Sequence, residues 1–174
     1  MMTLMVMALV VFLSALLQTV LPSFALLGHV KFPFLVSVVI YYALYRGGIP
    51  MMGSAFAAGI TQDILTPMMP PGYSVICFLC IGVILGLFRD IVLTESIFTW
   101  GILGGAATAV YMLLMYILLS RSGLIECPLR RGLLKVAGSG LLGCVCAPAI
   151  FLFASRFDSL VGNIELRNRS DAFE

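Results

Sequence analysis

Long apolar segments separated by short polar connectors are the feature that most restricts how this chain can fold. The segments cover residues 3–21, 33–45, 51–66, 73–88, 96–119 and 133–154. A helix needs about 20 mainly apolar residues to cross the hydrocarbon core of a bilayer. Backbone that faces lipid must satisfy its own hydrogen bonds, and no alternating strand pattern is present. The sequence therefore predicts an all-α integral membrane protein with about six transmembrane helices in a single bundle.

The composition favours the same class of protein. Of the 174 residues, 61% are hydrophobic and only 10% are charged, whereas about 25% are charged in soluble domains. A soluble globule of this composition would lack the polar residues needed to cover its surface. We expect a transmembrane helical domain over residues 1–156 and a polar, cytosolic or disordered tail over 157–174. The first segment is expected to be a retained anchor, because no Lys or Arg precedes it.

The charges exclude one class of partner but do not orient the chain. A formal net charge of +2, without a basic stripe interleaved with aromatic residues, argues against nucleic-acid binding. Six spans would place both termini on one side of the membrane. Five Lys or Arg residues then fall on each side, so the positive-inside rule does not choose between the two orientations.

The cysteines and histidine do not form a chemical motif. Cys77 and Cys80 make a CxxC, but no second CxxC and no nearby histidine accompany it, so neither a metal nor a redox site is expected. GxSxG, HExxH and Walker A patterns are also missing. We therefore expect no enzyme activity, no cofactor and no metal.

Asp63 is the one acidic residue placed well inside an apolar segment. It lies near the end of that segment, and Gly59, four residues earlier, shares its helix face. Pro70, Pro71 and Gly72 then form a turn signal. Two interpretations stay open: a polar anchor for another helix or a ligand in a local recess, or a carboxylate that caps backbone amides of the turn. Proton relay or catalysis is disfavoured, because no second embedded acid, His or Lys accompanies Asp63.

Small residues recur four apart in several segments. The pairs include Gly53 and Ala57, Gly82 and Gly86, Gly101 and Gly105, and Gly143 and Ala147. This spacing lets helices pack closely where lipid supplies no hydrophobic drive. Packing within the chain is favoured over a partner interface.

Residues 33–90 contain an ordered set of these features. Pro33 opens the second segment, Tyr42 follows nine residues later, Gly59 and Asp63 form a Gly-x-x-x-Asp, and Gly72 follows a short connector. This order and spacing resembles the bacterial rod shape-determining protein MreD family. Gln62 stands where relatives usually have an apolar residue. The candidate partner or packing residues are Pro33, Tyr42, Gly59, Gln62, Asp63 and Gly72.

The resemblance implies a six-helix fold similar to the substrate-binding components of energy-coupling-factor vitamin transporters. It implies an inner-membrane protein with cytoplasmic termini that binds MreC. It also implies that the protein acts in one complex with MreB, RodA and a class B penicillin-binding protein, and that this complex supports peptidoglycan synthesis and cell-shape maintenance. The expected function is a non-enzymatic scaffold. The alternative is a vitamin-transporter component, whose first helix usually has an alanine-spaced docking face; this chain has only Ala8 and Ala15, seven apart.

Overall fold

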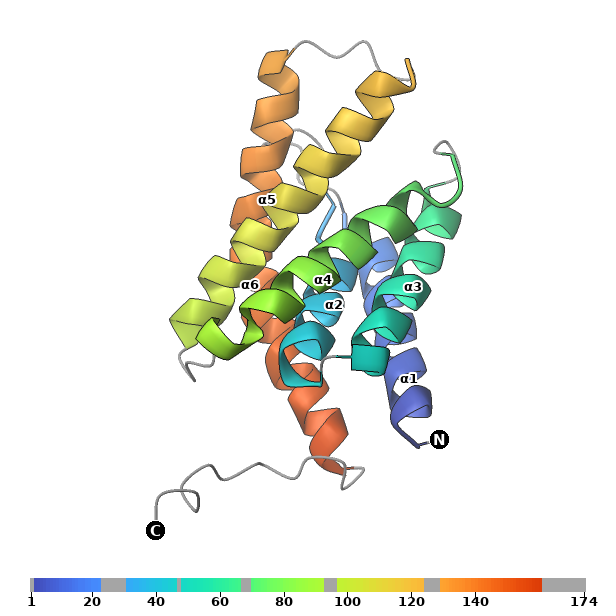
Figure 1. Ribbon diagram of the computed structural model, residues 1–174, viewed down its shortest axis with the longest axis vertical. Helices are drawn as coiled ribbons and strands as arrows, with labels where there is room; N and C mark the ends of the chain where they lie inside the picture. The colour runs from blue at the N-terminus through green and yellow to red at the C-terminus, as the bar shows by residue number, and fades with distance from the viewer. Residues whose placement is uncertain are drawn as a thin grey trace.

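Six helices make up the part of the chain that the computed structural model describes, which is residues 2–22, 31–46, 48–66, 70–92, 97–123 and 129–160. They are α1 (Met2–Val20), α2 (Phe34–Tyr45), α3 (Gly48–Leu65), α4 (Tyr73–Val92), α5 (Ile97–Arg121) and α6 (Leu129–Leu160) (Figure 1). The predicted all-α fold is confirmed for these residues.

Three helices, α3, α4 and α6, have boundaries that differ from the expected ones by more than two residues, and α4 continues past the expected 73–88 to Val92. α3 begins at Gly48, although residues 47–50 had the composition of a tight turn. Pro50 lies in the first turn of the helix, where backbone N–H groups have no intrahelical partner, so its missing N–H costs no hydrogen bond. α6 extends beyond the expected 133–154 at both ends and reaches Leu160. The rest of the expected polar tail, residues 161–174, lies outside the described residues.

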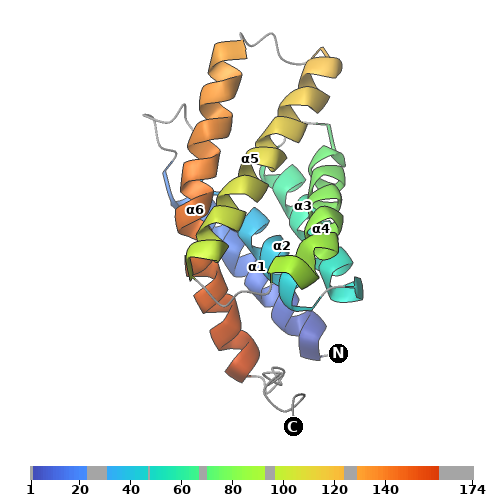
Figure 2. The same ribbon diagram turned by 60° about the vertical axis from the view of Figure 1, so that its left-hand side comes forward.

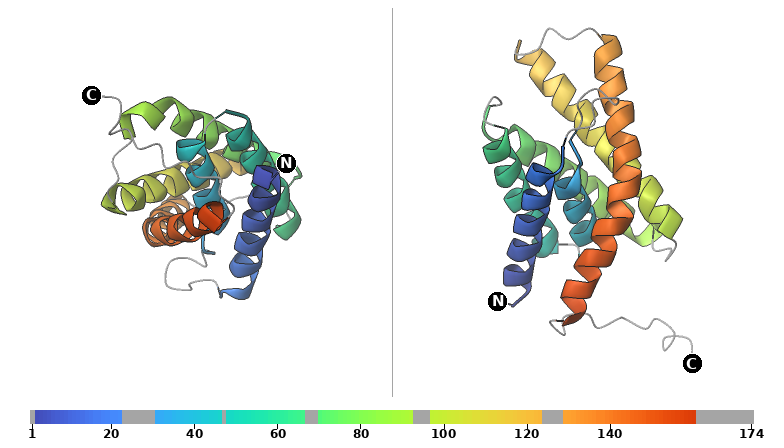
Figure 3. Two further views of the ribbon diagram at one scale, coloured as in Figure 1. Left: turned by 90° about the horizontal axis from the view of Figure 1, so that it is seen from below. Right: turned by 180° about the vertical axis from the view of Figure 1, so that it is seen from behind.

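α2 lies at the centre of the bundle. Figure 3 shows it among the other helices. It contacts all five of them, and every residue from Phe34 to Leu44 is buried. With 12 residues, it is about 18 Å long. A helix that is apolar on all sides is suited to a protein interior or to lipid, and here the other five helices enclose it.

α5 and α6 are joined by small residues. A Cβ at Gly104 would collide with Ala147, one at Gly105 with the Sγ of Cys144, and one at Gly143 with Thr108. The two helices form a hairpin that rises beyond the ends of α1 to α4 (Figure 2). The prediction that the small-residue spacing serves internal packing is confirmed for this pair of helices.

Two helical stretches are long and apolar enough to cross a membrane, Phe98–Arg121 and Gly132–Phe157. Large exposed apolar side chains also occur on α1 and on α3 to α6, among them Phe12, Ile64, Leu87, Phe98 and Val145. Such surfaces are unusual on soluble monomers. Both features support a membrane location. α1 begins and α6 ends at the same end of the bundle (Figure 3).

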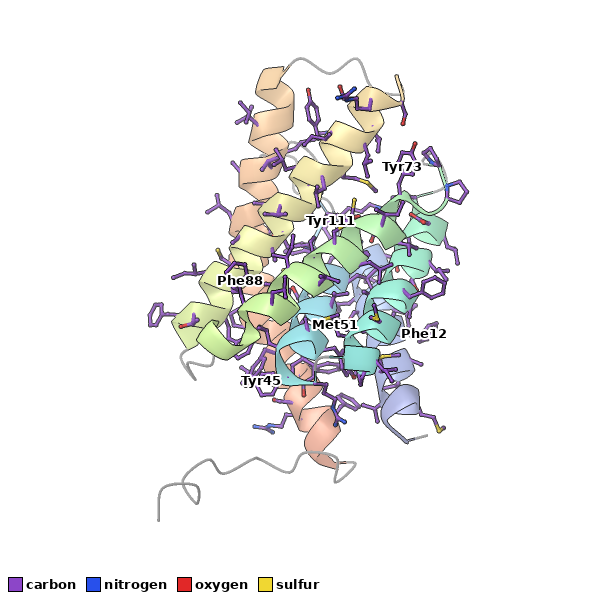
Figure 4. The ribbon with its side chains drawn as sticks, in the orientation of Figure 1. Phe12, Tyr45, Met51, Tyr73, Phe88 and Tyr111 are labelled. Atoms are coloured by element: carbon purple, nitrogen blue, oxygen red, sulfur yellow. The ribbon has the colours of Figure 1, made fainter. Side chains whose placement is uncertain are left out.

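Aromatic residues distinguish the two ends of the bundle. At the end where α2 stops, Trp100 stacks on Phe151 with ring centroids 4.1 Å apart and on Tyr45 with centroids 5.3 Å apart. At the opposite end, the hydroxyl groups of Tyr73 and Ser122 lie 2.8 Å apart and join the start of α4 to the end of α5. Figure 4 shows Tyr45 and Tyr73 at these two ends. Tyr and Trp are typical of membrane–water interfaces.

Candidate functional site

The turn between α3 and α4 is organised by the carboxylate of Asp63. This residue lies in the last turn of α3, and its Oδ2 accepts a hydrogen bond from the backbone N–H of Gly72 at 2.6 Å. Its Oδ1 accepts one from the N–H of Ser74 at 3.2 Å. The first N–H groups of a helix have no intrahelical partner, and a negative charge is favoured beside them. Asp63 therefore caps α4 from the preceding helix.

Gly59 lets the start of α4 approach α3 closely. A Cβ at this position would lie 2.5 Å from the Cα of Val75 and 2.9 Å from its backbone nitrogen. Because the obstacle is backbone, a small side-chain movement would not make room. Gly59 and Asp63 lie one turn apart on α3, so the same face provides both the space and the cap for the first turn of α4.

Gly72 has a backbone conformation that glycine adopts most easily. Its φ is +97°, in a region that residues with a Cβ rarely occupy. Its N–H is also one of the two groups bonded to Asp63. Gly59, Asp63 and Gly72 thus act together in one structural unit, which we call the α3–α4 cap.

Gln62, the neighbour of Asp63, joins α3 to a different helix. Its Oε1 accepts a hydrogen bond of 2.9 Å from Nε2 of Gln18 on α1. Gln18 and Ser14, four residues apart on α1, are both buried. Gln18 was missed as a candidate from the sequence. The signal was available in Ser14 and Gln18, which place two polar side chains on one face of an otherwise apolar helix.

The remaining two candidates belong to α2. Pro33 directly precedes this helix, and its carbonyl oxygen accepts hydrogen bonds from the N–H and the Oγ of Ser37, each at 3.2 Å. Tyr42 is fully buried, with its ring 5.2 Å from that of Tyr41 in an edge-on arrangement. Pro33 and Tyr42 therefore take part in starting and packing the central helix. The structure assigns the other four candidates to the end of α3 and the start of α4.

A groove of about 720 Å³ lies beside the α3–α4 cap. Its lining consists of Phe56, Ile60, Asp63, Ile64, Pro71, Gly72, Val75 and Ile76. Asp63 is the only charged residue among them. Both sequence-based interpretations of Asp63 therefore have a structural counterpart: its oxygens cap the turn, and its side chain also borders a recess.

The described residues give Asp63 no acidic companion. Among the side chains that the structure describes, it carries the only carboxylate. In the same part of the chain, no three His, Cys, Asp or Glu side chains gather into a group that could hold a metal ion. His29 and Cys127 lie outside the described residues.

No family model, curated protein or solved structure matches this chain. The function of the site is therefore inferred from its own geometry and from the resemblance of residues 33–90.

Proposed function

We propose that this chain is a non-enzymatic scaffold subunit of the bacterial cell-elongation complex and that it binds MreC. The observation that carries this proposal is the α3–α4 cap. Gly59, Asp63 and Gly72 carry much of the resemblance to the MreD family, and they act in one structural unit. Asp63 bonds Gly72 across the turn, and Gly59 gives the first turn of α4 the room to lie against α3, so the three matching positions serve one local structure.

The membrane placement that goes with this function is a multi-pass protein of the inner membrane. Support comes from the two long apolar helical stretches and from the exposed apolar side chains of the other helices. The five outer helices would then contact lipid around the buried α2, with both termini in the cytoplasm. The end of the bundle that carries Tyr45 and Trp100 would then face the cytoplasm, because α1 begins and α6 ends there.

A scaffold of this kind acts by binding and requires no reacting group. Partner helices can pack against its apolar faces, where van der Waals contact and interhelical hydrogen bonds drive association in lipid. Through MreC, the chain would take part in one assembly with MreB, RodA and a class B penicillin-binding protein. Its contribution to peptidoglycan synthesis would be to position these partners in the membrane.

Depletion and co-purification test this function together. In rod-shaped bacteria that depend on this chain, its depletion should produce rounded cells. Solubilised, affinity-tagged protein should recover MreC from the same cells. Unaltered cell shape after depletion, together with no recovery of MreC, would reject the proposed function.

One observation favours the alternative function, a vitamin-binding transporter component. The Oγ of Ser14 and the Oε1 of Gln18 are buried and have no hydrogen-bond partner among the described residues, and convergent polar groups are typical of ligand pockets. Tight binding of a vitamin to the purified protein, with normal shape in depleted cells, would favour this alternative over the scaffold.

A further inference from the structure

The groove beside the α3–α4 cap has walls built for helix packing. On α3, Phe56, Ile60 and Ile64 are four residues apart, and all three are exposed. Residues at this spacing form a ridge along a helix surface, and helices pack by placing the ridge of one in the groove of another. On α4, the exposed side chain of Ile76 forms the facing wall. The groove therefore has the form of a space between two helices that a third could occupy.

One charged group lies in this apolar groove. Asp63 borders it, and its carboxylate accepts hydrogen bonds from the N–H groups of Gly72 and Ser74. Those two N–H groups at the start of α4 stabilise the carboxylate, but neither of them carries a formal positive charge. Among the described residues, no Lys or Arg forms an ion pair with Asp63. A groove with one carboxylate, and no cation facing it among the described residues, is complementary to an apolar surface with one positive charge.

A protein helix fits these properties better than lipid does. Acyl chains can cover an apolar surface but provide neither a fixed shape nor a charge at a fixed height. A transmembrane helix provides both, and ionisable residues in membranes are usually paired. A symmetric pair of copies joined groove to groove is disfavoured, because it would place a second Asp63 against the first.

We propose that the groove formed by Phe56, Ile60, Ile64 and Ile76 binds one transmembrane helix of the partner, with a Lys or Arg of that helix beside Asp63. Resting on the proposed function, this identifies the surface through which the scaffold holds MreC. The apolar side chains of the bound helix occupy the groove, and its basic residue lies near the end of its apolar stretch, level with the α3–α4 turn.

Two isoleucines offer a matched test of the surface. Ile64 lines the groove and is 72% exposed, and Ile102 lies on α5, outside the groove, and is 71% exposed. Tryptophan at position 64 fills the groove, so Ile64→Trp should reduce the MreC that co-purifies with the full chain by about tenfold or more. Ile102→Trp should leave it within about twofold of wild type. Equal effects of the two variants would overturn the proposed docking surface.

Asp63→Asn tests the charge separately from the fold. An asparagine oxygen can still accept a hydrogen bond from the turn, while the negative charge is removed. We expect the amount of MreC that co-purifies with Asp63→Asn to fall about tenfold. The thermal unfolding midpoint of this variant in detergent should fall by far less than that of Asp63→Ala. Full MreC recovery by Asp63→Asn would reject the charge pairing.

Cross-linking tests the occupant directly without relying on a destabilised variant. A photoreactive amino acid at position 60 in the full chain, activated in native membranes, should link to the transmembrane helix of MreC. The same residue at position 102 should not. Links from position 60 only to lipid, or only to a second copy, would overturn the proposed docking surface. The proposed function would still stand in that case, provided that MreC co-purifies with the wild-type chain. If wild type never recovers MreC, the proposed function fails and the docking inference fails with it.

Discussion

A carboxylate inside an apolar segment has to be compensated, and two backbone N–H groups compensate that of Asp63. At a helix centre in a bilayer the insertion cost of Asp is about 2.5–3.5 kcal/mol. Asp63 lies two residues before the end of α3, where this cost is smaller. The free-energy cost of Asp63 is therefore reduced at this position, because the next helix starts within hydrogen-bonding distance of its oxygens.

The cap makes Asp63 a stability determinant whatever binds in the groove. Asp63→Ala removes both acceptors and should lower the free energy of unfolding by about 0.5–2 kcal/mol, the usual cost of losing a helix cap. Asp63→Asn keeps one acceptor and should lower the free energy of unfolding by less than Asp63→Ala does. Thermal or denaturant unfolding in detergent measures both variants, and equal losses would show that the hydrogen bonds do not matter.

Gly59 should be far less tolerant of a methyl group than another helical glycine. Gly59→Ala places a Cβ 2.5 Å from the backbone of Val75, and overpacking of this kind costs about 1–3 kcal/mol. At Gly82 the nearest atom would be the Cγ of Met51 at 3.5 Å, an ordinary contact. Gly82→Ala is the matched control and should be neutral or stabilise by up to about 1 kcal/mol, because alanine favours helix. The unfolding midpoints of the two variants should shift in different directions or by clearly different amounts.

At the scale of elements, the helices are joined by two kinds of contact. α5 and α6 approach through glycines whose missing side chains leave room for the facing backbone. α1 and α3 are joined by an amide pair, Gln18 and Gln62, that spans 44 residues of sequence. Close packing and interhelical hydrogen bonds are the two interactions that lipid cannot replace.

The amide pair should show measurable coupling. In a double-mutant cycle with Gln18→Leu and Gln62→Leu, each single change leaves a polar partner without its bond, and the double change removes both partners. The double variant should therefore lose less stability than the sum of the single losses, by about 0.6 kcal/mol and at most about 1.7 kcal/mol. Additive losses in detergent unfolding would show that the two side chains act independently.

At the scale of the whole molecule, the short helix α2 occupies the centre and the other five surround it. α1 begins at the end of the bundle where α6 finishes, and α5 finishes at the opposite end. A multi-pass arrangement in one membrane would therefore expose Arg46 on one side and Ser122 on the other.

Single cysteines test this arrangement in a background whose native cysteines are replaced. Under the proposed topology, Ser122→Cys should react with a membrane-impermeant maleimide added outside spheroplasts. Arg46→Cys should react only after the membrane is permeabilised. Labelling of both positions from the same side would contradict the arrangement of helices across the membrane.

The sequence by itself determined the local features of this protein. Apolar segments of helical length predicted the six helices, and the four-residue spacing of Gly59 and Asp63 placed both on one face of α3. These predictions succeed because hydrophobicity and helical periodicity depend on residues close together in the chain. The start of α3 at Gly48 was not predicted, since glycine and proline suit both a turn and a first helical turn.

Only the tertiary structure decided which distant residues meet. It decided that Asp63 reaches the N–H groups of Gly72 and Ser74, that Gln62 pairs with Gln18, and that Val75 lies against Gly59. It also decided that α2 is central and that a groove opens beside the α3–α4 cap. These features depend on how helices far apart in the chain are rotated and placed against one another. Spacing within one segment contains no information about that placement.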